Sequence, residues 1–283
     1  MNSATIKLFL PFGDPNRLRT AEISNWSGKA VAAPRTDLDQ ILGRDELRQA
    51  GIYILTGTDP ETGKPVAYIG EAEVIRDRLK QHRDRDFWVQ AIVFVSKNEN
   101  LTKAHIRYLE GRLIADATSA GRVEVLNSQS SGARLPESDR EDLEVFLGKI
   151  HQLLPVLGSD IVTPILQPTG AGTAQSDTLI CEIKGLVAKG RRTATGFVVF
   201  EGSQAVLANR PSAAAQHPFV VVLREKLTSG GTLVRESDHL RFTKNAEFSS
   251  SSAAAAVVHG GGANGLLAWK NQEGKTLKQM EGE

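Results

Sequence analysis

Two tyrosines stand in nearly mirrored settings within GIYILTGTDPETGKPVAYIG, residues 51–70, where Tyr53 follows Gly-Ile and Tyr68 precedes Ile-Gly. The segment DPETGKP between them is rich in turn formers, so the apolar runs IYIL and VAYI are expected to form a hairpin. A phenol donates and accepts hydrogen bonds, and an activated phenol can take a proton from water. Tyrosine is also common in strands, so for either ring alone the simpler interpretation is core packing with a bonded hydroxyl.

An arginine and a histidine follow on the next predicted helix, VIRDRLKQH, residues 74–82. Helical spacing places Arg78 and His82 on the apolar face of this helix, which is expected to pack on the sheet. A guanidinium carries a planar fork of donors that suits phosphate oxygens. Taken alone, Arg78 is explained at least as well by a snorkelling side chain, and a lone histidine on such a face is usually a satisfied core residue.

A carboxylate interrupts the apolar stripe of a longer predicted helix, residues 102–117, and this residue is Glu110. The stripe consists of Ile106, Leu109, Leu113, Ile114 and Ala117. A carboxylate removed from water needs an ion pair, a hydrogen bond or a metal ion. A structural salt bridge stays open, although the neighbouring Arg107 and Arg112 lie on other faces of the helix.

These residues need a scaffold that brings them together, and residues 51–127 alternate strand and helix signals. After the hairpin and the first helix come the strand WVQAIVFV, the longer helix and the short strand VEVL. Asn127 directly follows VEVL, at a position where asparagine is usually a turn residue. A further helix is expected over residues 137–154. The first 50 residues predict an extension of short strands, IKLFL, TAEIS and KAVAA, and a polar helix over residues 37–49.

The composition changes after this region, and residues 155–177 are dense in Pro, Gly, Ser and Thr, which predicts a linker. Residues 178–283 then predict a second, smaller α+β domain of short strands and helices. Within it, SSSSAAAAVVHGGGANG is expected to form a serine-capped alanine helix that glycines end. The single cysteine, Cys181, stands between apolar residues and is expected to be buried.

The whole-chain composition excludes several classes of protein. A hydrophobic fraction of 40% and a charged fraction of 24% are ordinary for a globular protein. The net charge of +1 gives no global basic field, so any nucleic-acid binding must come from a local patch. One cysteine excludes a disulfide framework within the chain and a cysteine-rich zinc site. With neither a signal peptide nor a long apolar run in the sequence, we expect a cytoplasmic protein with no membrane partner.

The order of the chemical residues resembles the GIY-YIG nuclease family. The naming motifs are Gly51-Ile52-Tyr53 and Tyr68-Ile69-Gly70, followed by YIGEAEVIRDRLKQH, HIRYLEGRLI and VEVLNSQ. The family's site residues correspond in order to Tyr53, Tyr68, Arg78, His82, Glu110 and Asn127. Two departures are a longer segment between the motifs, residues 54–67, and Ala72 at a position often held by serine.

The resemblance implies a small mixed or antiparallel sheet flanked by helices, and a DNA endonuclease that uses one Mg²⁺ or Mn²⁺ held by Glu110. Arg78 would contact the non-bridging phosphate oxygens, Tyr53 would act as the base, and Tyr68 and His82 would orient water or share the proton. The hairpin would place the two phenols on opposite sides of the reacting phosphate. Asn127 would anchor the site by hydrogen bonds, and no organic cofactor is implied.

A second resemblance covers residues 179–283, on FVVFEGS and on FSSSSAAAAVVHGGGANGLLAWKNQEGKTL. This region resembles a domain of unknown function that is fused to such nucleases and is similar to the RAMA module, which has been proposed to read modified DNA. The residues expected to contact DNA are Lys189, Arg191, Arg192 and Trp269. A solvated hairpin turn is an even alternative for the KGRR segment. Three further alternatives stay open: a DNA-binding adaptor that no longer cuts, a structural scaffold, and a homodimer acting on both strands of a duplex.

Overall fold

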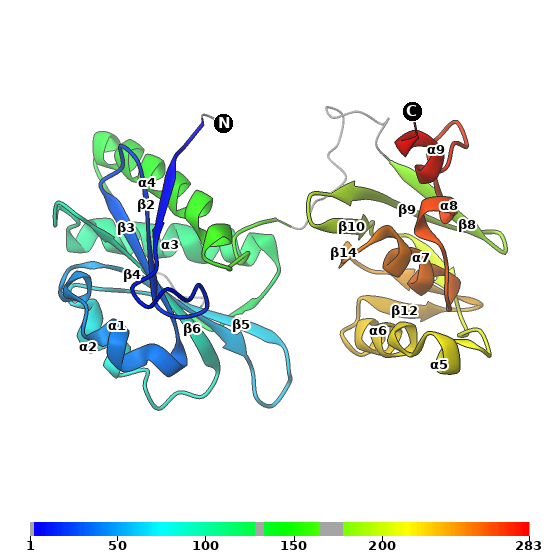
Figure 1. Ribbon diagram of the computed structural model, residues 1–283, viewed down its shortest axis with the longest axis horizontal. Helices are drawn as coiled ribbons and strands as arrows, with labels where there is room; N and C mark the ends of the chain where they lie inside the picture. Colours follow the sequence, from blue (N-terminus) through cyan, green and yellow to red (C-terminus); the bar gives the residue numbers. More distant parts are fainter. Residues whose placement is uncertain (1–2, 128–132, 165–177, 283) are drawn as a thin grey trace. The chain divides into compact units, whose positions relative to one another are not determined.

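The computed structural model describes residues 3–127, 133–164 and 178–282, and the chain divides into two compact units, Met1–Pro164 and Ile165–Glu283 (Figure 1). Each unit combines β-sheet with helices, so the predicted α+β class is confirmed. None of the helices in these described ranges is long and apolar enough to cross a bilayer.

The first unit is built on a seven-stranded sheet with the order β1-β2-β3-β6-β4-β5-β7. The strands are β1 (Ile6–Phe9), β2 (Arg19–Ile23), β3 (Gly28–Pro34), β4 (Gly51–Thr58), β5 (Pro65–Ala72), β6 (Trp88–Ser96) and β7 (Glu124–Val125). Neighbouring strands are antiparallel except β5 and β7, which pair in parallel over two residues. The first three strands join the sheet through β6, so the predicted N-terminal extension is part of the same sheet as the predicted nuclease strands.

Helices cover both faces of this sheet (Figure 1). On β4, Ile52 and Ile54 face the helices α3 (Lys103–Ala120) and α4 (Glu137–Val156). Tyr53 and Leu55 alternate with them and face the other layer. That layer contains α1 (Leu38–Leu42) and α2 (Ile75–Lys80), with the 3-10 helices η1 (Arg35–Asp37) and η2 (Asp45–Arg48). The period-two alternation of β4 therefore sends its tyrosine toward α2.

Two predicted segments differ from the structure. The polar helix expected over residues 37–49 is wrong as a single element, because α1 stops at Gly43 and Arg44 has an extended backbone before η2 begins. The start of the predicted linker is wrong as well. Leu157, Ile161 and Val162 are buried in the core of the first unit, because apolar side chains lie among the proline and glycine residues that suggested a linker. Residues 165–177 lie outside the described residues.

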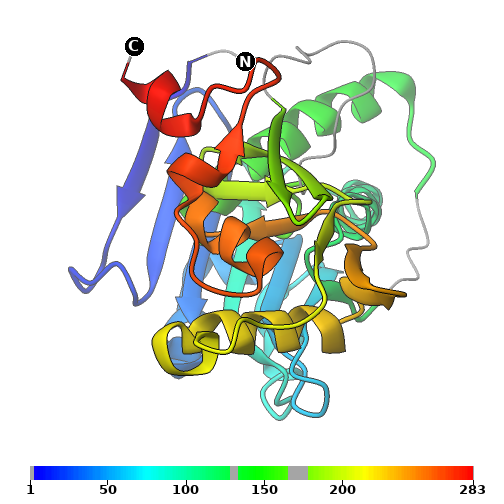
Figure 2. The same ribbon diagram turned by 90° about the vertical axis from the view of Figure 1, so that its right-hand side faces the viewer.

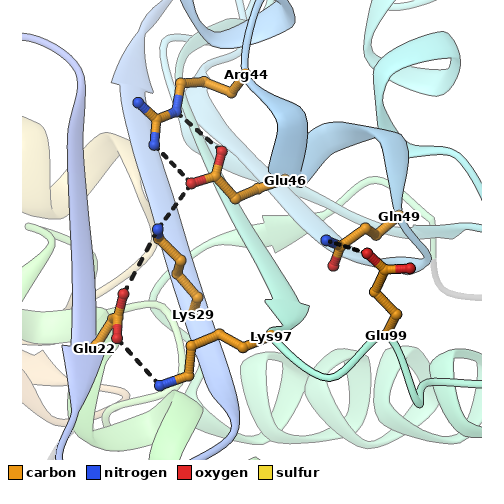
Figure 3. Close-up of polar contacts among 7 residues, drawn as sticks. All are labelled: Glu22, Lys29, Arg44, Glu46, Gln49, Lys97 and Glu99. Atoms are coloured by element: carbon orange, nitrogen blue, oxygen red, sulfur yellow. Dashed lines mark hydrogen bonds and ion pairs between the residues drawn. The ribbon is translucent and has the colours of Figure 1, made fainter.

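A ladder of alternating charges joins the first strands to η2 (Figure 3). Lys97 Nζ and Lys29 Nζ lie 3.1 and 3.6 Å from the two Glu22 carboxylate oxygens. Lys29 also lies 2.9 Å from Glu46, which accepts from Arg44 at 2.6 Å. Burial opposes the ionisation of Glu46, but the hydrogen bonds from Arg44 and Lys29 outweigh it and lower its pKa to about 2. The ladder thus stabilises η2 against the sheet at neutral pH.

The second unit contains a five-stranded sheet, β14-β10-β9-β8-β15, and a three-stranded sheet, β11-β13-β12. The strands are β8 (Leu179–Ile183), β9 (Leu186–Thr193), β10 (Gly196–Val199), β11 (Gln204–Val206), β12 (Leu233–Glu236), β13 (His239–Phe242), β14 (Ala246–Phe248) and β15 (Trp269–Lys270). The helices are α5 (Ala213–Gln216), α6 (Pro218–Ser229), α7 (Ser251–His259), α8 (Gly265–Ala268) and α9 (Leu277–Glu281).

Helix α7 forms the centre of this unit and contacts strands of both sheets. Figures 1 and 2 both show α6 on the side of α7 away from the five-stranded sheet. The Ser250 side chain caps α7 at its start, and Gly260 ends it with a left-handed φ of 64°. The predicted serine-capped alanine helix is therefore confirmed. Cys181 is fully buried, as expected, and burial raises the pKa of its thiol to about 12.

Candidate active site

The two tyrosines belong to one hairpin whose turn is set by local hydrogen bonds. Asp59 Oδ1 accepts from the backbone N–H groups of Glu61 and Thr62 at 3.0 and 2.6 Å. The resulting register places Tyr53 opposite Gly70 and Leu55 opposite Tyr68. The two rings are therefore diagonal neighbours on one face of the sheet, stacked with centroids 6.0 Å apart. The expectation that the phenols flank a phosphate from opposite sides is wrong, because they lie side by side.

The glycines of the two motifs make room for protein atoms. A Cβ at Gly70 would lie 2.4 Å from the ring carbon Cζ and from the hydroxyl of Tyr53. A Cβ at Gly51 would lie 2.3 Å from the carbonyl oxygen of Phe94 on β6. Gly70 thus lets the Tyr53 ring lie flat across the neighbouring strand, and Gly51 lets two strands approach closely.

The Tyr53 hydroxyl is the centre of a polar cluster on the α2 side of the sheet. Arg78 Nε donates to this oxygen at 3.2 Å, and His82 Nε2 lies 3.0 Å from it. A second Arg78 nitrogen lies 3.5 Å from the Tyr68 hydroxyl, and a third donates to Gln81 at 2.7 Å. Arg78 is exposed and reaches inward from the end of α2, so it bridges both phenols and the solvent.

Burial controls the proton affinity of this cluster. Tyr53 is fully buried, and this burial, with the neighbouring Tyr68, raises the pKa of its phenol above the ordinary value although Arg78 opposes the shift. Burial, together with the charges of Arg85 and Arg78, lowers the pKa of His82 to about 4. His82 is therefore neutral near pH 7, and its Nε2 can accept the Tyr53 hydroxyl proton.

Asn127 holds the strand that carries Tyr68. Its Oδ1 accepts from the backbone N–H of Ile69 at 3.1 Å, and its Nδ2 donates to the Ile69 carbonyl. This paired contact continues the edge of β5 where β7 ends, since β7 pairs with Val66 and Ala67 alone. The predicted anchoring role agrees with this geometry, and Asn127 acts on the backbone between the tyrosine and the glycine.

A cleft of about 360 Å³ opens at the free edge of β5, and it collects side chains from both faces of the sheet. Tyr53, Tyr68 and Arg78 line it from the α2 side, and Glu110 lines it from α3. Four of the six predicted residues thus share one cleft. His82 lies behind Tyr53 and Asn127 braces β5, so these two support the cleft from outside its lining.

Glu110 is half-buried and, within the described ranges of the chain, it forms no ion pair. Burial and then repulsion from the Glu71 carboxylate raise its pKa, while the Glu71 backbone amide favours the charged form. The salt bridge that stayed open from the sequence is therefore absent here. A partly desolvated carboxylate facing a cleft is free to accept a cation.

Glu71 and Lys103 are among the cleft residues that the sequence interpretation missed. Glu71 follows Gly70 and shares the face of Ile69, which turns it toward α3. Lys103 lies two turns before Glu110 on α3, and its Nζ is 2.8 Å from Glu71. The helical spacing of 103 and 110 was a signal for Lys103. The role of Glu71 depends on how α3 crosses the strand edge, which no local pattern reveals.

Residues 35–49, which lie between β3 and β4, form hydrogen bonds with α2 and with the loop that follows it. Arg35 donates to the backbone carbonyls of Arg83 at 2.9 Å and Trp88 at 3.3 Å, and also to that of Arg85. Its guanidinium lies 4.9 Å from the Trp88 ring centroid, and the Trp88 indole donates to the His82 carbonyl at 2.9 Å. These contacts fix the loop that carries His82.

Residues 35–49 also form hydrogen bonds with the first residues of α2. The Gln49 carbonyl accepts from the N–H of Ile75 at 3.3 Å, and the Arg44 carbonyl accepts from Arg76 at 3.1 Å. Residues 35–49 therefore contact both ends of the helix that positions Arg78.

The donor set at the cleft fits a single hard divalent cation. In the described ranges no cluster of three or more His, Cys, Asp or Glu side chains could enclose a metal ion. A site with one carboxylate from Glu110, completed by water and phosphate oxygens, is the arrangement that Mg²⁺ favours in nucleotide-processing proteins. A cation there would relieve both the desolvation of Glu110 and its repulsion from Glu71.

The predicted DNA contacts of the second unit are only partly accessible. Trp269 is fully buried against Phe197, with ring centroids 4.4 Å apart, and its indole donates to the Ser251 carbonyl at 3.0 Å. Trp269 is therefore a core residue, and the expectation that it contacts nucleic acid is wrong. Arg192 forms an ion pair with Glu281 at 2.5 Å.

Comparison with known proteins identifies part of the second unit. Residues 179–281 match the model of DUF4357, a domain of unknown function. No curated protein and no solved structure matches the chain. The resemblance of residues 51–127 to GIY-YIG nucleases stays a prediction, which rests on its five motifs.

Proposed function

We propose that this protein is a divalent-metal-dependent DNA endonuclease of the GIY-YIG type. The observation that carries the proposal is the cleft at the free edge of β5. There, Arg78 and two phenols from one face of the sheet meet Glu110 from the other face. A guanidinium, two phenols and a carboxylate that forms no ion pair within the described part of the chain suit phosphodiester hydrolysis.

The residues divide between charge stabilisation and proton handling. Arg78 binds the non-bridging oxygens, because it lines the cleft and its guanidinium is held there by Tyr53 through Nε. Glu110 holds the cation, which when bound would act as a Lewis acid and stabilise the leaving oxygen.

The buried position of Tyr53 changes the proposed path of the proton. Its raised pKa disfavours a free phenolate, so direct action as a base would need strong activation. Tyr68 is half-buried at the cleft and is the phenol better placed to contact the attacking water. Tyr53 fixes Arg78 and shares a hydrogen bond with the neutral His82, so it orients the cluster and takes no proton from water.

The direct test is nicking of a supercoiled plasmid with and without Mg²⁺ or Mn²⁺. Glu110→Gln and Arg78→Ala are each expected to lower the rate by roughly a hundredfold to a thousandfold, because each removes charge stabilisation in the transition state. Lys80→Ala is the matched control for Arg78, since Lys80 is an exposed cation on the same helix whose partner is Asp77. Metal-binding titration of Glu110→Gln with Mn²⁺ reports on the carboxylate independently of cleavage.

Two outcomes would redirect the proposal. Metal-dependent cutting that survives Glu110→Gln would place the activity at another site. DNA binding without cleavage by the wild-type chain would favour the adaptor that no longer cuts.

We further propose that the second unit contacts DNA and senses base modification. The support is its DUF4357 match, the resemblance of this region to the RAMA module, and its connection to a phosphodiester-cleaving unit. Competition between methylated and unmethylated duplexes of one sequence tests this. Equal affinity for both duplexes would remove modification sensing.

A further inference from the structure

The register of the five-stranded sheet gathers three cations on one of its faces. Lys270 on β15 lies beside Ile180, which lies beside Lys189 on β9. Arg191 follows Lys189 by two residues and points to the same side. From this arrangement we infer that Lys189, Arg191 and Lys270 form a surface that binds the phosphate backbone of DNA.

The three cations are available to an external anion. Lys189 and Lys270 are exposed, and Arg191 is half-buried. Among the residues described, none of the three has an ion-pair partner. The Arg191 Nε–H is buried without an acceptor, so this guanidinium is incompletely hydrogen-bonded. Because Nε is sealed from solvent, an external phosphate would contact the outer nitrogens of Arg191, which no carboxylate pairs with among the described residues.

Arg192 lies on the opposite face, although it is the immediate neighbour of Arg191. It pairs across the sheet with Phe197, a core residue, and its guanidinium is neutralised by Glu281. The KGRR segment therefore divides between the two faces. Lys270, which is remote in sequence and was not expected from it, replaces Arg192 in the surface.

The surrounding residues favour directed contacts over general attraction to anions. Ile180 and Val187 separate the charged side chains, and Glu182 and Glu247 lie on the same face. With two carboxylates present, the net charge of the face is small, so a membrane of anionic lipids would gain little from it. A nucleic-acid backbone can instead place individual phosphates against the cations. The choice of DNA as the ligand rests on the proposed function, in which the first unit cleaves DNA. Because both units belong to one chain, DNA bound by one unit is present at a raised local concentration for the other.

The test measures binding, in EDTA so that cleavage does not contribute, by fluorescence anisotropy of a short labelled duplex with the full chain. The triple variant Lys189→Ala, Arg191→Ala, Lys270→Ala is compared with Arg192→Ala as the matched control. The triple variant is expected to raise Kd by about tenfold or more. It is also expected to reduce the slope of log Kd against log salt concentration by about 3, one unit for each lost phosphate contact. Arg192→Ala is expected to leave both quantities unchanged.

A charge-conserving variant separates binding from folding. Lys189→Arg with Lys270→Arg is expected to retain the wild-type Kd, and all variants are expected to keep the wild-type Tm. Equal binding by the triple variant and Arg192→Ala would overturn the inference. Binding of phosphatidylserine vesicles as tight as that of duplex, and lost in the same triple variant, would overturn it in favour of a membrane. A wild-type chain that never cleaves but shows the predicted loss of binding would contradict the nuclease and leave this surface intact.

Discussion

The Tyr53 hydroxyl is held between a cation and a neutral imidazole. It accepts from Arg78 and donates to His82, and both contacts are about as short as neutral hydrogen bonds normally are. Protonation of His82 would remove its capacity to accept and would add a second positive charge beside Arg78. The cluster is therefore stable in one protonation state, with the tyrosine and histidine both neutral.

The first prediction concerns the pH dependence that follows from His82. Its pKa of about 4 lies below the ordinary 6.5, so the unfolded chain binds this proton before the folded chain does. The stability that depends on a neutral His82 is fully present above pH 6.5 and is lost as the pH falls from 6.5 through 4. Between pH 7 and pH 5, the free energy of unfolding measured with urea is expected to fall less for His82→Gln than for the wild type. An NMR titration that gives His82 a pKa near 6.5 would contradict this account.

At this scale the sequence predicted residue types better than their surroundings. Helical phase correctly turned Arg78 toward the two phenols, but α2 ends at Lys80, so His82 reaches Tyr53 from the turn that follows the helix and not from the predicted helix over residues 74–82. The same reasoning could not show that Tyr53 is fully buried while Tyr68 is half-buried, since both alternate identically with apolar neighbours. Trp269 illustrates the other limit: a large amphipathic ring can serve a core or a surface, and packing against Phe197 decided between them.

A prediction for the hairpin follows from the close contact at Gly70. In Gly70→Ala the new methyl would overlap the Tyr53 ring and hydroxyl, which belong to a fully buried side chain with no free space. We expect a loss of about 1–3 kcal/mol in unfolding free energy, typical of overpacking, and displacement of the phenol from Arg78. Gly148→Ala is the matched control, because its Cβ would meet no atom within 4 Å on α4. This control is expected to stabilise the protein by about 0.5–1 kcal/mol.

Chemical denaturation of the two glycine variants provides the measurement. Equal stability of Gly70→Ala and wild type would mean that the Tyr53 ring can move without cost.

The loop after α2 supports another prediction. Arg35→Ala removes three hydrogen bonds to the carbonyls of residues 83, 85 and 88, and also a cation–π contact with Trp88. We expect His82 to become better solvated, so that its pKa rises from about 4 toward 6.5, and the acid limb of any pH–rate profile moves with it. Arg48→Ala is the control, because exposed Arg48 pairs with exposed Asp45 and, among the described residues, forms no hydrogen bond with the loop after α2.

Proton NMR of the histidine ring in both arginine variants provides the measurement. An unchanged His82 pKa in Arg35→Ala would show that Arg35 does not position this loop.

Element prediction was most successful where one face of a segment is apolar. The strands IKLF, RTAEI and GKAVAAP, the hairpin and the helices α3 and α4 were all expected, because their periodicity is maintained over several turns or alternations. Residues 37–49 failed because Gly43 and Arg44 break a pattern that composition alone made helical. The pairing of β3 with β6 is a long-range contact with no local signature, so the place of the first strands in the sheet could not be predicted.

The two units have separate hydrophobic cores. The core residues of the first unit lie on the two faces of the seven-stranded sheet, and those of the second lie around α7. A protein built in this way can divide its work, with chemistry in one unit and ligand contact in the other. A fragment ending at residue 164 keeps every described residue of the two clusters that surround the candidate active site.

The last prediction compares two fragments, residues 1–164 and residues 51–164. The shorter fragment removes β3, so β6 loses its partner along seven residues, and it removes Leu38, Ile41 and Leu47, which cover the α2 layer. Each fully buried side chain of this kind contributes about 1.5–3 kcal/mol. Three such side chains amount to roughly 4.5–9 kcal/mol, which is comparable with the roughly 5–15 kcal/mol that stabilises a whole domain, and the exposed strand edge adds to this loss. We therefore expect residues 1–164 to unfold cooperatively, and residues 51–164 to aggregate or remain unfolded.

Circular dichroism and thermal denaturation measure the folding of both fragments, and plasmid nicking measures the site. Residues 1–164 are expected to retain the metal-dependent rate of the full chain at saturating DNA, because the whole cleft lies within them. The motifs at residues 51–127 would then be insufficient without the preceding strands and the segment that holds α2. Cooperative unfolding and cleavage by residues 51–164 would instead make the first 50 residues dispensable and would limit the catalytic unit to the part that the motifs mark.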